Sequence, residues 1–220
     1  MRKLAFTKNI IATAMLLLTV IPAVDAGSSE STFDRIDHSR LNKHVKLFVK
    51  SYIRENSTNL FNIKRRSSSP FIVIDSVFKL YGIPIQLKYL AVVESDLKTK
   101  ARSKVGAVGP WQLMPSTARI LGLKVNSRVD ERKNYYKSSK AAARYLKDLH
   151  DEYGDWLLVF AAYNSGEGPV NSAIKISGTR NYWKLQSLLP EETREYVEKF
   201  IATCYYFEGT YTPSLYSVHR

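Results

Sequence analysis

The sequence predicts an essentially all-α domain with one small non-helical lobe. Apolar residues recur at spacings of three and four along most of the chain, which is the period of an amphipathic helix. The stretch from Arg102 to Pro115 interrupts this pattern, because its two glycines and two prolines exclude one continuous helix. No run of residues resembles a βαβ unit, and no internal repeat is visible.

Residues 1–26 have the order of a secretory signal peptide. Basic residues precede an uncharged run, Asn9–Val24, and small side chains at Val24 and Ala26 place cleavage after Ala26. The alternative is an uncleaved membrane anchor, but the uncharged run is short for a span that needs about 20 residues. We therefore expect an exported protein that acts in the periplasm.

The helices follow in order from local signals. Apolar spacing predicts a helix from about His38 to Asn56, and the basic, serine-rich stretch Lys64–Ser69 is typical of a solvated loop. Further helices are predicted over Pro70–Tyr81, Pro84–Ser95, Ser116–Leu121, Asn134–Tyr153, Trp156–Asn164, the segment from the Gly166–Pro169 turn to Gly178, Asn181–Leu189 and Glu191–Phe207. Ser116 and Asp155 are the expected N-caps, and Gly82 and Gly154 the expected helix stops.

Composition limits the classes of protein that the chain can belong to. Of its 220 residues 45% are hydrophobic and 12% aromatic, which excludes a largely disordered chain. The single cysteine, Cys204, excludes an intramolecular disulfide and a cysteine-rich metal cluster, and its helical spacing predicts a core position. The net charge of +13, with a pI of about 9.7, indicates an anionic partner. Export makes nucleic acid an improbable partner.

Glu94 is the strongest candidate for a reactive group. It shares one predicted helical face with Leu87, Leu90 and Ala91, so its carboxyl group points where the apolar stripe points. Burial and the negative end of the helix dipole would both raise its pKa, as a general acid working near neutral pH requires. Helix geometry alone still favours the simpler alternative, a glutamate at the edge of the stripe whose carboxylate reaches water or pairs with a lysine.

The segment after Glu94 could form a binding site. Gly106 and Gly109 permit close approach of the backbone to a ligand, Gln112 offers an amide that donates and accepts, and Met114 offers a pliable apolar contact. Taken alone, these residues are also consistent with a turn that leads into a capped helix.

Four motifs together resemble the lytic transglycosylase (SLT, lysozyme-like) domain. In family order they are Glu94-Ser95; Gly106-x-x-Gly109-x-x-Gln112-x-Met114-Pro115-x-Thr117-Ala118; Ala161-Ala162-Tyr163-Asn164-x-Gly166-x-x-x-Val170; and Leu189-Pro190-x-Glu192-Thr193-Arg194-x-Tyr196-Val197. The lead from Tyr81 through Pro84 into Glu94 resembles the membrane-bound lytic murein transglycosylase D type, here without LysM repeats. The resemblance implies a lysozyme-like helical domain over residues 83–208. The remaining residues are then expected to form a signal peptide (1–26), an N-terminal helical extension (27–82) and a C-terminal tail (209–220).

The resemblance also implies an activity and a set of site residues. The enzyme would cleave the bond between N-acetylmuramic acid and N-acetylglucosamine in peptidoglycan to give 1,6-anhydromuramoyl products, with Glu94 as acid and then base. The implied substrate-binding residues are Ser103, Gln112, Met114, Tyr163, Asn164 and Tyr196. Spacing alone places the two tyrosines in the core, and Asn164 and Ser103 could simply end a helix and close a loop.

The implied partners follow from this chemistry. Peptidoglycan glycan strands are the expected partner, with no nucleic acid, no metal and no cofactor, and peripheral association with the cell wall or an anionic membrane would suit the net charge. We expect a monomer. The alternatives are a goose-type lysozyme-like hydrolase and a non-catalytic peptidoglycan-binding module.

Overall fold

The computed structural model describes residues 43–208, and the predicted signal peptide and C-terminal tail lie outside them. The α-helices of this part are α1 (Lys43–Arg66), α2 (Ser68–Tyr81), α3 (Tyr89–Ser95), α4 (Pro115–Ile120), α5 (Tyr135–Tyr153), α6 (Trp156–Ser165), α7 (Glu167–Ser177), α8 (Tyr182–Leu185) and α9 (Glu191–Glu208). Short 3-10 helices cover Ile85–Lys88, Glu131–Lys133 and Gln186–Leu188. The predicted all-α class is confirmed.

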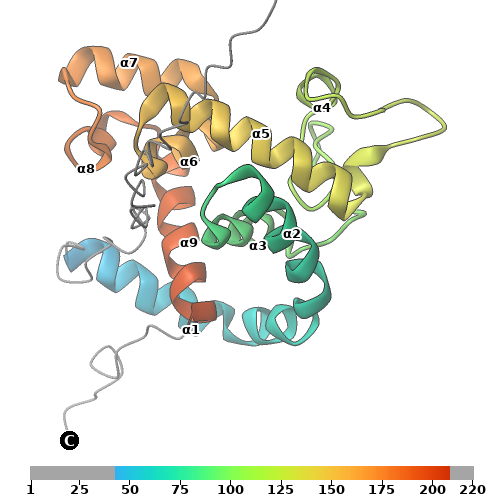
Figure 1. Cartoon of the computed structure of the whole chain (residues 1–220). Coiled ribbons are helices and arrows are strands. Elements are labelled where there is room, and N and C mark those ends of the chain that lie inside the picture. Colours follow the sequence, from blue (N-terminus) through green and yellow to red (C-terminus); the bar gives the residue numbers. More distant parts are fainter. Residues whose placement is uncertain (1–42, 209–220) are drawn as a thin grey trace, which may run out of the picture. The chain divides into compact units, whose positions relative to one another are not determined.

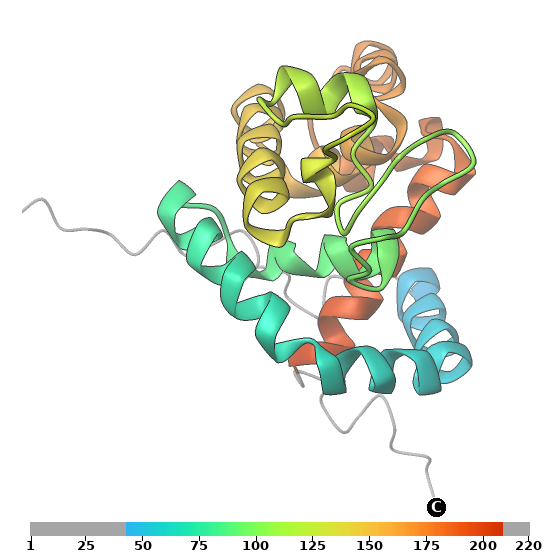
Figure 2. The same cartoon turned by 90° about the vertical axis from the view of Figure 1, so that its right-hand side faces the viewer.

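Helices α6 and α9 form the centre of the domain. Every residue of α6 from Trp156 to Ala162 is buried, and the Phe160 ring lies 4.2 Å from that of Phe200 on α9. Helix α9 packs against α1, α3 and α6, and α5 packs against α2 and α6 (Figures 1 and 2). Helix α3, which carries Glu94, therefore packs against the central helix α9.

The non-helical lobe lies between α3 and α4, as predicted. Isolated antiparallel bridges join Val108 to Arg102 and to Leu113, so the segment is a compact loop with β-like pairing. Figure 2 shows this loop and α4 on one side of the domain, beside α5.

The predicted loop at Lys64–Ser69 is wrong. Helix α1 continues to Arg66, α2 begins at Ser68, and only Ser67 separates them. Three basic residues occupy the last turn of α1, where cations stabilise the negative end of a helix. The Ser67 hydroxyl donates to the Lys64 carbonyl at 2.9 Å and ends the helix there.

Local capping explains the helices that the sequence predicts well. The Asn134 side chain accepts from the Lys137 amide and starts α5, which ends at Gly154 in the left-handed conformation. Asp155 then accepts from the Leu157 amide at 2.8 Å and starts α6. Both the Gly154 stop and the Asp155 cap are confirmed.

Three predicted details differ in the structure. The segment after Pro84 begins as a 3-10 helix and becomes α-helical only at Tyr89. Ser116 is not an N-cap, because α4 begins one residue earlier with Pro115 in its first position. Asn181–Leu189 forms the short α8 followed by a 3-10 turn, with Asn181 as the cap.

Cys204 packs against the core, and burial raises the pKa of its thiol.

Candidate active site

Glu94 lies in the last turn of α3, where the chain changes direction sharply. Asp96 and Leu97 follow it with φ of 55° and 62°, a conformation that costs non-glycine residues energy. The Leu97 side chain is 1% exposed, and its amide donates to the Ala91 carbonyl. Burial of Leu97 thus stabilises a turn that ends α3 immediately after the glutamate.

The environment of the Glu94 carboxyl group favours its protonated form. Burial raises its pKa from 4.5 to about 7, and the hydrogen bond from Tyr196, which favours the carboxylate, opposes part of this rise. The Tyr196 hydroxyl donates to Oε1 at 2.7 Å. Glu94 nevertheless keeps part of its surface exposed. A substantial fraction of the molecules therefore carries a proton at Glu94 near neutral pH.

Tyr163 approaches the same carboxyl group from α6. Its hydroxyl donates to the Trp111 carbonyl at 2.7 Å, which joins α6 to the non-helical lobe. Burial, and then the negative charge of Glu94, raise the pKa of Tyr163. The structure thus brings together Glu94, Tyr163 and Tyr196 from three helices, α3, α6 and α9.

The lobe is fastened to α3 and closes on itself. The Ser95 hydroxyl donates to the Pro110 carbonyl at 2.9 Å, directly beside the glutamate. Ser103 closes a turn: its hydroxyl accepts from the Ala107 amide at 3.0 Å, and its own amide donates to the Ala107 carbonyl. Ser103 therefore has the loop-closing contact that the sequence left open, and its hydroxyl proton remains able to donate.

Gly109 is required by a contact that the sequence did not predict. A Cβ atom there would lie 2.1 Å from the Arg132 carbonyl oxygen, at a φ of +86°. The protein's own backbone thus approaches this glycine too closely for any other residue. Gly106, with a φ of +95°, has open space around it.

Gln112 and Met114 differ in how they are held. Gln112 has a φ of 45°, and its Nε2 donates to the Gly109 carbonyl at 2.8 Å, so its amide nitrogen fixes the loop. Its Oε1 atom is then the group able to accept from a ligand. Met114 is 38% exposed, and Asn164, in the last turn of α6, is partly exposed.

Two other carboxylates, Asp96 and Glu167, belong to the same motifs or follow Glu94 closely, and their surroundings differ from those of Glu94. Asp96 binds Lys98 Nζ at 2.9 Å and lies 3.3 Å from Asn59 Nδ2. Glu167 starts α7 and faces a separate pocket. Among the described residues, burial and Tyr196 account for the pKa of Glu94, and no second carboxylate contributes.

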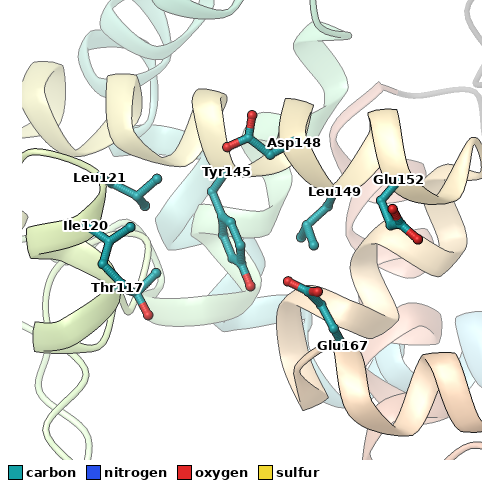
Figure 3. Close-up of a pocket in the computed structure, with 8 residues that line it drawn as sticks. All are labelled: Thr117, Ile120, Leu121, Tyr145, Asp148, Leu149, Glu152 and Glu167. Carbon is teal, nitrogen blue, oxygen red and sulfur yellow. The ribbon is translucent and has the colours of Figure 1, made fainter.

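That separate pocket lies between α4, α5 and the start of α7, and has a volume of about 440 Å³ (Figure 3). Its lining residues are Thr117, Ile120, Leu121, Tyr145, Asp148, Leu149, Glu152 and Glu167. Sequence reasoning missed Tyr145, whose ring centroid lies 5.6 Å from that of Tyr163, because its spacing with Leu149 is that of ordinary core residues. We call this site the α4–α5–α7 pocket.

Comparison with known proteins identifies the domain. Residues 79–186 match the family model of the transglycosylase SLT domain. The chain carries an SLT domain. The matched residues of this SLT domain include Glu94 and Asn164 and end before Tyr196, so α9 adds the hydrogen-bond donor to Glu94 from outside the matched range.

Individual relatives agree with this family. The chain is 37% identical over 166 residues to membrane-bound lytic murein transglycosylase D of Escherichia coli (strain K12), covering 73% of this chain and 36% of that protein. It is 39% identical over 84 residues to peptidoglycan transglycosylase gp16 of Escherichia phage T7, covering 37% of this chain and 6% of that protein. The chain thus spans well under two thirds of the length of these relatives.

Solved structures show the same fold as this SLT domain. The lytic transglycosylase Slt of Pseudomonas aeruginosa matches with a TM-score of 0.54 and 25% identity, covering 63% of this chain and 24% of that one. The 70 kDa soluble lytic transglycosylase SLT70 of Escherichia coli matches with a TM-score of 0.53 and 26% identity, covering 64% and 25%. The predicted lysozyme-like SLT fold is confirmed.

Residues 43–208 contain neither a metal-binding cluster nor a helix suited to span a membrane. Within residues 43–208, no group of three or more His, Cys, Asp or Glu side chains is arranged to hold a metal ion. In the same range, no helix combines the length and the apolar character that a membrane span needs.

Proposed function

We propose that this protein is a peptidoglycan lytic transglycosylase. It cleaves the β-1,4 bond between N-acetylmuramic acid and N-acetylglucosamine without water and leaves a 1,6-anhydromuramoyl end. The observation that carries the proposal is one partly exposed residue, Glu94, whose carboxyl group has a pKa raised to about 7 in a domain of the SLT family. Relatives named as lytic murein and peptidoglycan transglycosylases support the substrate class.

In the first step, protonated Glu94 donates its proton to the oxygen that bridges the two sugars. The bond from C1 of the muramoyl sugar to this oxygen breaks, and N-acetylglucosamine leaves with a free hydroxyl group. The acetamido group of the muramoyl sugar stabilises the positive charge that develops at C1. A pKa near 7 suits this role, because the acid is still substantially protonated at neutral pH.

In the second step, the Glu94 carboxylate acts as a base. It removes the proton of the muramoyl 6-hydroxyl group, whose oxygen forms the new bond to C1. Glu94 is protonated again, so the cycle closes without consuming water. Tyr163, Asn164 and Ser103 orient the acetamido group, Tyr196 holds the carboxylate, and Gln112 and Met114 line the groove.

A single carboxylate suffices for this reaction. Hydrolytic glycosidases usually place two carboxyl groups on either side of the bond, as acid and as nucleophile or base. Here the substrate itself provides the nucleophile, its 6-hydroxyl group. The surroundings of the other two carboxylates agree with a one-carboxylate mechanism. Asp96 contacts Lys98 and Asn59, and Glu167 lies in the α4–α5–α7 pocket.

We further propose where the protein works and how it is divided. Residues 1–26 export it to the periplasm, residues 83–208 form the catalytic domain, and the helices before residue 83 brace it. The packing of α1 on α9 and of α2 on α5 supports the bracing role. The excess of 33 Lys+Arg over 20 Asp+Glu would concentrate the protein on the acidic cell wall.

The test is to measure the products that the Glu94→Gln variant releases from purified sacculi. We expect wild type to release 1,6-anhydromuropeptides, and the variant to lose at least about a hundredfold in rate while keeping its circular dichroism spectrum. Asp96→Asn is the matched control, an acid-to-amide change two residues away, and should remain within about twofold of wild type because it keeps its loop contacts.

Mass spectrometry separates the alternatives. Products heavier by one water than the anhydro form would identify a hydrolase and overturn the proposal. Wild-type protein that binds sacculi and releases nothing would instead identify a non-catalytic binding module. Near-normal anhydro product from Glu94→Gln would reject Glu94 as the acid.

A further inference from the structure

The α4–α5–α7 pocket differs in charge from the rest of the protein. Three of its eight lining residues, Asp148, Glu152 and Glu167, are acidic, and none is basic. The whole chain has the opposite balance, with 33 Lys+Arg against 20 Asp+Glu. An acidic cavity on a basic protein indicates a ligand group of positive charge.

Two basic side chains of the surrounding helices make contacts outside the pocket, and a third basic side chain, from the segment after α7, reaches a lining carboxylate. Lys147 pairs with Asp151 at 3.1 Å, and Arg119 donates to the Val125 carbonyl. Arg180 lies 3.5 Å from the Glu152 carboxylate. Glu152 is thus partly compensated, and Asp148 and Glu167 supply most of the negative charge of the pocket.

The pocket also has an apolar and aromatic wall. Leu121 and Leu149 are buried, and Ile120, at 82% exposed, stands at the rim. Figure 3 shows the Tyr145 ring between Thr117 of α4 and Glu167 of α7. Such a cavity suits a ligand that combines small apolar groups with a cation.

The pocket adjoins the proposed reaction centre. Tyr145 contacts Tyr163, whose pKa is raised in part by the charge of Glu94. Thr117 lies on α4, three residues after Met114 of the proposed groove. The pocket thus lies beside residues that the proposed mechanism assigns to the substrate.

We propose that the α4–α5–α7 pocket binds the stem peptide of the glycan strand being cut, with a free amine of that peptide placed between Asp148 and Glu167. This inference rests on the proposed function. The stem peptide branches from the muramoyl sugar next to the reacting bond, and it carries both alanine methyl groups and, where it is not cross-linked, the amine of a diamino acid. The methyl groups would pack on Leu121, Leu149 and Tyr145.

The test compares three substrates made from one preparation of glycan strands. The first keeps its free stem-peptide amines, the second has these amines acetylated, and the third has its peptides removed by an amidase. We expect wild type to lose about fivefold in kcat/KM on acetylation, as for loss of one or two partly exposed charge pairs. Added salt should reduce this difference, because exposed charges are screened.

Variants assign the effect to the pocket. The double variant Asp148→Asn/Glu167→Gln should lose about fivefold on amine-bearing strands, show no further loss on acetylation, and match wild type on peptide-free strands. Asp151→Asn is the matched control on α5, outside the pocket, and should keep the full sensitivity to acetylation.

Two results would overturn the inference. One is a wild-type enzyme that cuts amine-bearing and acetylated strands equally fast, a result that requires no variant to fold. The other is a double variant that loses as much on peptide-free strands as on amine-bearing ones. Absence of anhydro product from amine-bearing strands with wild type would instead contradict the proposed function, so the two failures are distinguishable.

Discussion

Two carboxyl groups of this domain, Glu94 and Asp130, have opposite surroundings. Burial raises the pKa of Glu94 to about 7, and its hydrogen-bond donor is a neutral tyrosine, Tyr196. The guanidinium of Arg132 lowers the pKa of Asp130 by donating to both carboxylate oxygens, at 2.8 and 2.9 Å. The same chemical group is thus prepared for proton transfer in one region and for a permanent charge in the other.

The difference follows from what each region holds in place. Arg132, whose side chain is 4% exposed, also donates through Nη1 to the Gly106 and Leu113 carbonyls, so Asp130 and Arg132 anchor the non-helical lobe. A cation of this kind beside Glu94 would keep the glutamate ionised and remove its proton-donating form. Arg132 therefore holds the lobe through the Gly106 and Leu113 carbonyls. Among the described residues, no cation lowers the pKa of Glu94.

Removing the anchor gives the largest expected effect. Arg132→Met keeps an unbranched apolar stem at this buried position but leaves the partly exposed Asp130 without its partner, and leaves two lobe carbonyls without donors. We expect the free energy of unfolding to fall by about 3–5 kcal/mol, because each buried carbonyl that loses its donor costs about 1–3 kcal/mol and the charged hydrogen bonds to Asp130 are lost as well; urea denaturation at pH 7 measures this.

A second variant shows whether the loss comes from the uncompensated charge. Arg132→Met combined with Asp130→Asn should recover part of the stability, because the unpaired carboxylate is gone and only the lobe carbonyls lose their donor. A decrease below about 1 kcal/mol for the single variant would show that the lobe does not depend on this anchor.

How far the sequence predicts these two regions depends on whether the determinants are local. Asn134 and Asp155 cap the following helices through contacts within three residues, so the sequence shows both. The apolar helical face indicated the direction of the Glu94 side chain, but helix geometry alone favoured a carboxylate that reaches water. Its hydrogen bond from Tyr196 joins residues 102 positions apart, and only the family resemblance pointed to it.

The Asp130–Arg132 anchor and the α4–α5–α7 pocket were not predicted, because both bring together residues that lie far apart in the sequence. Arg132 has no motif around it, and its role arises because the lobe folds back over it from residues 106–113. The requirement for Gly109 likewise comes from the Arg132 carbonyl, 2.1 Å from where a Cβ would stand. At Lys64–Ser69, composition suggested a loop, whereas packing of Leu60 and Ile63 into the core keeps α1 helical to its end.

The second prediction concerns the free energy of unfolding that the protein loses when the buried Glu94 carboxyl group ionises. Its pKa is higher in the folded protein than the ordinary 4.5, so ionisation opposes folding. This penalty is absent below about pH 4.5, grows as the pH rises, and is complete above about pH 7. Glu94→Gln should therefore raise the free energy of unfolding by up to about 3 kcal/mol at pH 8 and change it little at pH 4.

Asp130 provides the contrast, because its pKa is lowered. Its pairing with Arg132 stabilises the fold above the ordinary Asp pKa of 3.8 and is lost as the pH falls through the lower folded value. Urea denaturation of wild type and Glu94→Gln across pH 4–8 checks the sign for Glu94, and the same measurement on wild type and Asp130→Asn across about pH 2–5 checks the sign for Asp130. Equal stability of the two proteins at pH 8 would show that Glu94 ionises in the fold at no cost.

The third prediction, with the smallest effect on stability, tests Tyr196 as a positioning residue. Tyr196→Phe removes the hydrogen bond to Glu94 that favours its carboxylate and keeps the buried ring. The pKa of Glu94 should rise further, so the decline of kcat/KM at high pH should move to a higher pH, with a stability loss of about 1 kcal/mol. A structural role alone would lower kcat/KM equally at every pH. The measured pH profile thus shows whether the neutral donor beside Glu94 sets its proton affinity or only supports the fold.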